Sequence, residues 1–258
     1  MRSPARSLST AVRSLSDSAR SLSDSARSLS LSKGHRVAKD HRVVYQVASL
    51  ALQYPDDTLL AQVPLLDAAI AEAGSAPSNT ALRRLVDHLA TTDPDGLRRD
   101  YVDLFDLSRR HTLYLTYWSD GDTRRRGSAL ADIKALYRES DFLCDTRGEL
   151  TDYLPMVLEF TARVNPDGGR ALLIEHRASL ELIRIALQEK GSPYADALVA
   201  VCATLPGDAP PDKASALALR PAPPAERVGL DAGDPRLLPL FTTTEMAVLK
   251  DGPPRRGR

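Results

Sequence analysis

Apolar residues recur at spacings of three and four along most of the interior of this 258-residue chain. Leu82, Leu85, Val86 and Leu89 form one such stripe. This spacing places apolar side chains on one face of an α-helix, whereas a half-buried strand needs alternation. The sequence offers no convincing alternating segment. We therefore predict an all-α fold, a single-domain bundle of about seven to nine helices. Helices are expected near residues 43–52, 58–73, 78–89, 94–106, 128–140, 152–164, 166–191 and 194–205.

Capping residues mark several of these expected helix starts. Asp56, Asp93 and Asn165 each stand before a helical segment, and a proline follows both Asp93 and Asn165. A side-chain oxygen at this position accepts hydrogen bonds from free N–H groups of the first turn, and proline fits the first helical position. Pro64 falls inside the segment 58–73, which it is expected to kink or divide.

The two ends of the chain have a different composition from the helical part. Four seven-residue units, RSLSTAV, RSLSDSA, RSLSDSA and RSLSLSK, follow one another from Arg6. One leucine per unit is too thin a seam for a coiled coil, and such Ser/Arg sequence cannot bury enough apolar area to fold. We expect residues 1–36 to be a disordered tail, either a basic tether or a repeat expansion without function. Residues 37–206 form the expected helical domain, and the Pro-rich segment 207–258 a largely disordered tail, in which 237–249 is a candidate docking element.

Charge and cysteine usage narrow the class of partner and the compartment. Lys+Arg and Asp+Glu are both 34, so the net charge is zero, which argues against nucleic acid or an anionic membrane as the main partner. Cys144 and Cys202 stand far apart without a CxxC motif and are read as free thiols in a reducing cytoplasm. The sequence contains neither 18 continuous apolar residues nor the apolar core of a signal peptide.

The segment 101–127 concentrates the aromatic residues of the chain. It begins with a helical stripe and then abandons that period where aliphatic and aromatic residues crowd between Leu113 and Trp118. Three arginines, Arg124 to Arg126, follow at once, either as a solvated helix face or as part of the recognition surface. An apolar connection between helices must pack over a groove or line one. We interpret this segment as the region that recognises a partner polypeptide.

The residues give little support to catalysis. The phosphate-binding glycine loop, the HExxH motif and the nucleophile elbow are all missing from the sequence, and the five histidines stand singly. Glu149, Asp152 and Glu159 lie close in sequence, either as acid–base groups or as ordinary helix-capping and surface carboxylates. We expect no enzyme activity, no metal and no cofactor. A carboxylate-dependent helical enzyme and a generic helical scaffold remain as alternatives.

Two segments carry a resemblance to a known family. They are YxxLFDLxRRxxLYLTYxxxGDTRxRGxAL at residues 101–130 and ELTDYLPMVLEF at residues 149–160. With these motifs the chain resembles the NarJ family, the delta subunits or assembly chaperones of respiratory nitrate reductase, within the wider group of TorD-like and DmsD-like maturation chaperones. The likeness extends over about residues 43–205. The family's second motif usually reads Glu-x-Pro-Asp-His, whereas this chain has Thr151 and Tyr153 in place of Pro and His.

The resemblance implies an all-helical cytoplasmic protein without catalytic activity. Its partner would be the N-terminal segment of the catalytic (alpha) subunit of nitrate reductase, held open for insertion of the molybdenum cofactor before membrane anchoring. Proteins of molybdenum cofactor biosynthesis are further expected partners.

A client helix would lay its apolar stripe on the aromatic segment, while acids attract its basic residues and Arg124 and Arg126 pair internally or contact client acids. The residues expected to bind this peptide are Tyr101, Leu104, Phe105, Leu113, Tyr114, Leu115, Tyr117, Asp122, Arg124, Arg126, Glu149, Asp152, Tyr153, Pro155 and Glu159.

Overall fold

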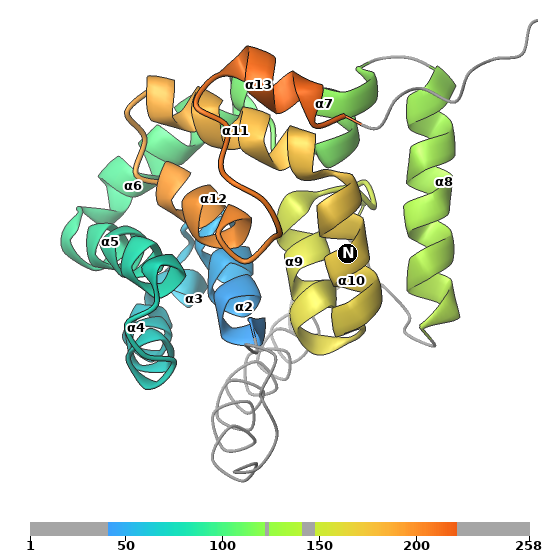
Figure 1. The fold of residues 1–258 in the computed structure, drawn as a ribbon. Coiled ribbons are helices and arrows are strands. Elements are labelled where there is room, and N and C mark those ends of the chain that lie inside the picture. Colours follow the sequence, from blue (N-terminus) through green and yellow to red (C-terminus); the bar gives the residue numbers. More distant parts are fainter. Residues whose placement is uncertain (1–40, 122–123, 141–147, 221–258) are drawn as a thin grey trace, which may run out of the picture. The chain divides into compact units, whose positions relative to one another are not determined.

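The computed structural model describes residues 41–121, 124–140 and 148–220 (Figure 1). Within these ranges the chain forms helices and no strand, apart from an isolated antiparallel bridge between Tyr114 and Tyr153. The predicted all-α, single-domain fold is confirmed. The elements are α2 (Arg42–Ala51), α3 (Asp57–Leu60), α4 (Val63–Glu72), α5 (Pro77–Thr91), α6 (Pro94–Tyr101), the π-helix η1 (Val102–Asp106), the 3-10 helix η2 (Arg109–His111), α7 (Leu115–Asp120), α8 (Arg124–Glu139), α9 (Leu154–Arg163), α10 (Pro166–Glu175), α11 (Arg177–Glu189), α12 (Ala195–Cys202) and α13 (Lys213–Ala218).

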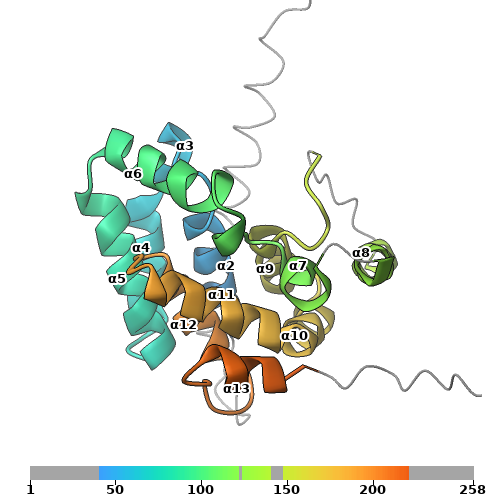
Figure 2. The same cartoon turned by 90° about the horizontal axis from the view of Figure 1, so that it is seen from above.

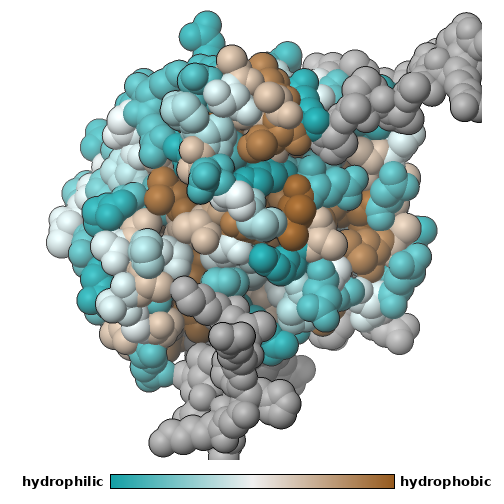
Figure 3. Space-filling view, viewed as in Figure 1, coloured by the Kyte–Doolittle hydropathy of each residue, from teal (hydrophilic) through white to brown (hydrophobic). Residues whose placement is uncertain are grey.

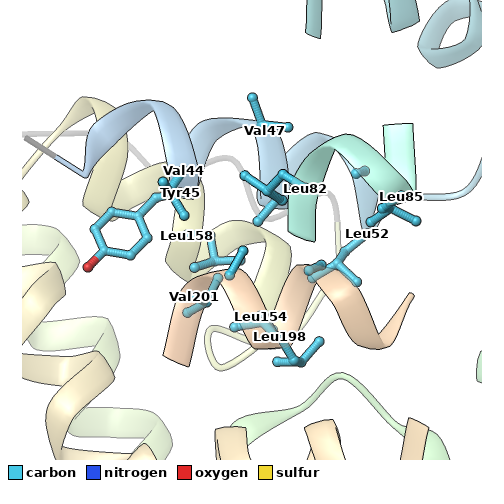
Figure 4. Close-up of a cluster of buried hydrophobic side chains, with 14 of the residues drawn as sticks. Val44, Tyr45, Val47, Leu52, Leu82, Leu85, Leu154, Leu158, Leu198 and Val201 are labelled. Carbon is cyan, nitrogen blue, oxygen red and sulfur yellow. The ribbon is translucent and has the colours of Figure 1, made fainter. Parts of the chain in front are cut away.

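Helix α2 is the centre of the core. It packs against α9, α12, α5 and α4, and Val47, Ala48 and Ala51 are fully buried on it. Figure 4 shows the side chains of α2 meeting those of α5, α9 and α12 in one cluster. A polar side chain of α2 also bonds to α9: the Ser49 hydroxyl donates to the Pro155 carbonyl at 2.7 Å. An element apolar on nearly all sides is stable only when other helices surround it.

The predicted caps are present at three helix starts. The carboxylate of Asp56 accepts a hydrogen bond from the Leu59 N–H at 2.8 Å. Asp93 does the same for the Gly96 N–H at 3.0 Å, and the Asn165 side chain for the Gly168 N–H at 2.8 Å. Each bond satisfies a backbone donor that the first helical turn leaves without a partner.

Several expected helices are divided in the structure. The segment 58–73 separates into α3 and α4, with Pro64 in the first turn of α4, where proline is tolerated. The segment 166–191, expected to be one helix, is broken at His176 (φ −91°, ψ 20°) into α10 and α11. This break lets α10 pack on α9 while α11 packs on α12. Together with the short α3, α7 and α13, such divisions bring the α-helices among the described residues to twelve.

The described residues include helix α13, which lies in the segment expected to be a Pro-rich tail. It packs on α11, and the compact unit that contains the core runs to Arg220. The Ser/Arg repeats of residues 1–36, the segment 237–249 and Cys144 lie outside the described residues. Cys202 is buried and free, as expected, and burial raises the pKa of its thiol. Among the helices described, none has the length and apolar character needed to cross a membrane.

Candidate functional site

The two sequence motifs meet in a short antiparallel contact. The Leu154 N–H donates to the Leu113 carbonyl at 2.8 Å, and the Leu115 N–H donates to the Asp152 carbonyl at 3.1 Å. These two bonds lie directly before α7 and at the start of α9. They therefore fix where both helices begin. The aromatic stretch after η2 is therefore ordered by the second motif, about forty residues later. We call this contact the motif junction.

Asp152 holds the junction from inside. Its side chain is fully buried, and Oδ2 accepts hydrogen bonds from the Thr116 N–H at 3.0 Å and from the Thr116 hydroxyl at 2.6 Å. Thr116 is in the first turn of α7, so Asp152 caps that helix from a distant part of the chain. Arg126 Nε donates to the Thr116 hydroxyl at 3.2 Å, which joins the start of α8 to the same network. This geometry favours the capping interpretation of Asp152 over an acid–base role.

Thr151, which replaces the usual proline of the family motif, joins α8 to the junction. Its hydroxyl donates to the Leu130 carbonyl at 3.1 Å, and its own carbonyl accepts from the Tyr137 hydroxyl at 2.9 Å. The ring of Tyr137 lies 4.5 Å from the ring of Phe160 on α9. A proline has no hydroxyl to donate, so the contact to Leu130 is specific to the residue found here.

Tyr101 is the centre of an aromatic cluster beside the junction. Its ring lies 5.6 Å from that of Tyr54, 4.8 Å from that of Phe105 and 5.8 Å from that of Tyr194. Its hydroxyl donates to the Leu52 carbonyl at 3.0 Å and lies 3.4 Å from the hydroxyl of Tyr153, the residue found where histidine is usual. Burial raises the pKa of Tyr101 and of Tyr153. Both hydroxyls are therefore neutral at physiological pH.

The cluster reaches the surface through Tyr153 and Tyr114. Their ring centroids lie 5.6 Å apart, and the Tyr114 hydroxyl donates to Glu149 Oε2 at 2.6 Å. Partial burial, and next the hydrogen bond to Glu149, raise the pKa of Tyr114. Glu149 itself is exposed. This side of the junction presents aromatic surface next to an acid.

A π-helical turn, η1, shapes the other side of the cluster. The Leu107 N–H bonds to the Val102 carbonyl, five residues earlier, at 2.9 Å. On this turn Leu104 is buried, and Asp103 and Asp106 are exposed. Leu107 is 75% exposed, the most exposed large apolar side chain among the described residues. Single π-turns of this kind are frequent at functional sites.

The predicted peptide-binding residues differ in how far their side chains are buried. Buried members hold the fold together and reach no partner in this conformation, because the aromatic stretch folds back onto the second motif. The buried members are Tyr101, Leu104, Leu113, Leu115, Asp152 and Pro155; Phe105, Tyr114, Tyr117, Arg126, Tyr153 and Glu159 are half-buried; Glu149 is exposed. Asp122 and the side chain of Arg124 lie outside the described residues.

Two of the half-buried charged residues have partners on their own side of the site. Glu159 pairs with Arg163 one turn later on α9 at 2.8 Å. Arg126 lies over the ring of Tyr117 at 5.8 Å, in addition to its bond to Thr116. Arg125 is exposed and lies 3.9 Å from Asp120. Arg126 thus has contacts within its own chain, and its expected contact with client acids stays a prediction.

Three residues of the site were not singled out by the sequence. Thr116 is the residue that Asp152 caps. Its position inside the first motif could have indicated that it belongs to the site. Tyr54 and Tyr194 complete the cluster around Tyr101 from distant segments, which no local pattern indicates. Among the residues that the structure describes, no three His, Cys, Asp or Glu side chains gather closely enough to hold a metal ion.

Comparison with known proteins finds one matching family and several relatives. The family model described as nitrate reductase delta subunit matches residues 71–200. The nitrate reductase-like protein NarX of Mycobacterium tuberculosis H37Rv is 43% identical over 162 residues, which are 63% of this chain and 24% of that protein. The probable nitrate reductase molybdenum cofactor assembly chaperone NarJ of Bacillus subtilis is 31% identical over 166 residues, which are 64% of this chain and 90% of that one. The chain thus spans about a quarter of NarX but nearly all of the Bacillus protein.

Among solved structures, a putative redox enzyme maturation protein from Archaeoglobus fulgidus is similar to this chain. The two superpose with a TM-score of 0.49 and 23% sequence identity. The similarity covers 67% of this chain and 94% of the other.

Proposed function

Because this chain belongs to the nitrate reductase delta subunit family, we propose that it is an assembly chaperone of respiratory nitrate reductase. In this role it binds the N-terminal segment of the apo catalytic (alpha) subunit. It holds that subunit open for insertion of the molybdenum cofactor and delays its membrane anchoring. The work takes place in the cytoplasm and requires no catalytic residue or resident cofactor in the chaperone itself, although proteins that synthesise the cofactor are further partners.

The observation that carries this proposal is the motif junction. Both segments that resemble the family, 101–130 and 149–160, meet there through two backbone hydrogen bonds and the buried Asp152–Thr116 cap. A cap of this kind fixes the position of the surrounding aromatic side chains before any partner binds. Preorganised apolar side chains lose little conformational entropy on binding, which favours a peptide-binding surface.

The proposed client surface consists of Tyr54, Phe105, Tyr114 and Tyr153. Tyr54 and Phe105 contact the ring of Tyr101, Tyr153 lies near its hydroxyl, and Tyr114 makes a tilted ring contact with Tyr153. All four are partly exposed, Tyr54 by 44%. We call these four residues the aromatic face. Phe105, Tyr114 and Tyr153 come from the predicted set and Tyr54 is added to them, whereas the buried residues Leu104, Leu113 and Leu115 do not meet the client in this proposal.

Acids border the aromatic face. Asp103 and Asp106 are exposed on η1, and Glu149 is exposed beside Tyr114. An amphipathic client helix with a basic flank would match this arrangement. Exposed charge pairs contribute little free energy, so the aromatic contacts carry most of the affinity and the acids contribute to selection of the client.

A binding experiment tests the client surface. Isothermal calorimetry would use a synthetic peptide with the N-terminal sequence of the catalytic nitrate reductase subunit from the same genome. The wild type should bind it with a dissociation constant of about 1 μM, a strength open to modest interfaces. Phe105→Ala should weaken binding by about tenfold or more. Ile174→Ala removes an apolar side chain that is 40% exposed on α10, and this matched control should bind as the wild type does.

A second experiment tests the cellular role. In a strain without this gene, the nitrate reductase catalytic subunit should accumulate without molybdenum, measured by metal analysis of the purified subunit. Restoring the wild-type gene should restore the metal content, and the Phe105→Ala gene should restore less of it. A normal molybdenum content in the deletion strain would contradict the proposed function.

A further inference from the structure

The segment that follows α12 returns across α11 and is held there by two buried arginines. Arg177 donates to the carbonyls of residues 206–208, and Arg184 donates to the Pro210 carbonyl at 2.7 Å. Both guanidinium groups also pair with the fully buried Glu181, at 3.0 and 2.5 Å. Helix α11 thus presents a buried cluster of two arginines around one carboxylate, and the remaining donors of the arginines point at the backbone of this segment. We call residues 206–220 the cover.

Helix α13 of the cover sits on a small apolar patch. Asp212 caps the helix by accepting from the Ser215 N–H at 2.8 Å. Ala216 is fully buried in a cluster with Leu182 and Ile185 of α11, and Trp118 of α7 packs against the same cluster. The buried residues of this cluster are not part of the main core cluster, and Trp118 packs against both. We call Trp118, Leu182 and Ile185 the seat.

The cover touches the first sequence motif directly. Arg220 donates to the backbone carbonyl of Trp118, whose indole N–H donates to the Thr112 carbonyl at 2.9 Å. Both views of the fold place α13 along α11, and α7 also packs against α11 (Figures 1 and 2). Trp118 thus connects the cover with Thr112, in the segment that links η2 to α7.

The contacts that hold α13 on the seat are few. Ala216 is the only fully buried side chain of this helix, and Leu217 and Leu219 are each 43% exposed. The ion pair between Lys213 and Glu189 joins two exposed side chains, so it contributes little. Figure 3 shows apolar residues in separate patches on this face, without one continuous apolar strip. The region matched by the family model ends at residue 200, before the cover begins.

We propose that the cover is a displaceable intramolecular competitor, and that an amphipathic helix of the client takes the seat when α13 leaves it. The inference rests on the proposed function and adds a second client contact regulated by this chain. The occupant is a helix with a small residue facing the seat, because an alanine is what the seat now holds. Opening leaves no buried charge unpaired, since Glu181 retains both arginines while their freed donors meet water.

Substitutions at Ala216 test the proposal. Ala216→Asp places a charge in the seat, and Ala216→Leu overfills it without a charge, so both should release α13. Ala214→Asp, at an exposed position of the same helix, is the matched control. Trp118 is the only tryptophan of the chain and lies in the seat, so its emission should shift to the red in both Ala216 variants and not in the control.

The same catalytic-subunit peptide then reports on competition. If the closed form outweighs the open one by about ten to one, release should raise the affinity for the peptide about tenfold in both Ala216 variants. Unchanged or weaker binding in variants whose Trp118 emission has shifted would overturn the competitor role while leaving the proposed function intact. Absence of peptide binding by the wild type and every variant would overturn both.

Discussion

One carboxylate oxygen of Asp152 accepts hydrogen bonds from both the backbone N–H and the hydroxyl of Thr116, at 3.0 and 2.6 Å. The bonds connect the two sequence motifs in the interior, where an unsatisfied polar group is costly. Thr116→Val keeps the shape of the side chain and removes the hydroxyl donor. It should lower the free energy of unfolding by about 1–3 kcal/mol, measured by urea denaturation.

The matched control is Thr80→Val, because the Thr80 hydroxyl bonds to a carbonyl on the exposed face of α5. Water replaces that bond when it is removed, so the control should change stability by less than about 0.5 kcal/mol. Equal losses in the two variants would contradict the structural role of the Asp152–Thr116 contact.

Two glycines should respond in opposite ways to replacement by alanine. A Cβ added to Gly169 on α10 would lie 2.7 Å from the Thr161 backbone Cα on α9, too close for any side chain. Gly169→Ala should therefore destabilise the protein by about 1–3 kcal/mol by forcing the two helices apart. Gly127 lies in α8 with open space around its Cβ position, so Gly127→Ala should stabilise by up to about 1 kcal/mol. Thermal unfolding of both variants measures the difference, and a stabilising effect of Gly169→Ala would refute the close helix contact.

The parts of the fold that local sequence determines were predictable. Asp56, Asp93 and Asn165 cap helices as their positions indicated, because a cap depends on residues within one turn. The apolar stripes identified the core helices for the same reason. The break at His176 was missed, since neither proline nor glycine stands there and the two helices are separated by their different packing partners.

The arrangement of the candidate site was less predictable, because it depends on contacts between distant segments. The motif segments were identified, but the sequence did not indicate that Leu113 bonds to Leu154 or that Asp152 turns inward to cap α7. Tyr101 is likewise covered in part by the ring of Tyr194, which stands more than ninety residues later in the chain. A pattern of residue types indicates which side chains matter, and tertiary packing decides which of them face a partner.

His176 should make stability depend on pH. The side chain is only 8% exposed, and burial lowers its pKa from the ordinary 6.5, against smaller raising effects of Glu175, Asp120 and Asp152. When the pH falls below 6.5, the unfolded chain binds a proton at this residue while the folded chain does not. The free energy of unfolding should therefore decrease from pH 6.5 down to the lower pKa of the folded state.

Urea denaturation at pH about 7.5 and about 5.5 measures this effect. His176→Gln removes the titrating group, so its loss of stability between these two values should be smaller than that of the wild type. His88 is half-buried and its pKa is also lowered by burial, so His88→Gln should reduce the loss by less. A larger change from His88 than from His176 would contradict the assignment.

Replacement of Glu181 should lower the stability of the fold more than replacement of an exposed carboxylate. Its carboxylate is fully buried between Arg177 and Arg184, and Glu181→Gln removes the negative charge while leaving both cations in place. Breaking a buried ion pair on one side costs about 3–5 kcal/mol, because the remaining charge has no compensation. Glu189→Gln is the control, since Glu189 is exposed and pairs with the exposed Lys213; its loss should not exceed about 1 kcal/mol. Urea denaturation of both variants gives the comparison. A loss for Glu181→Gln as small as that of the control would mean that the two arginines are satisfied by the carbonyls of residues 206–210 alone.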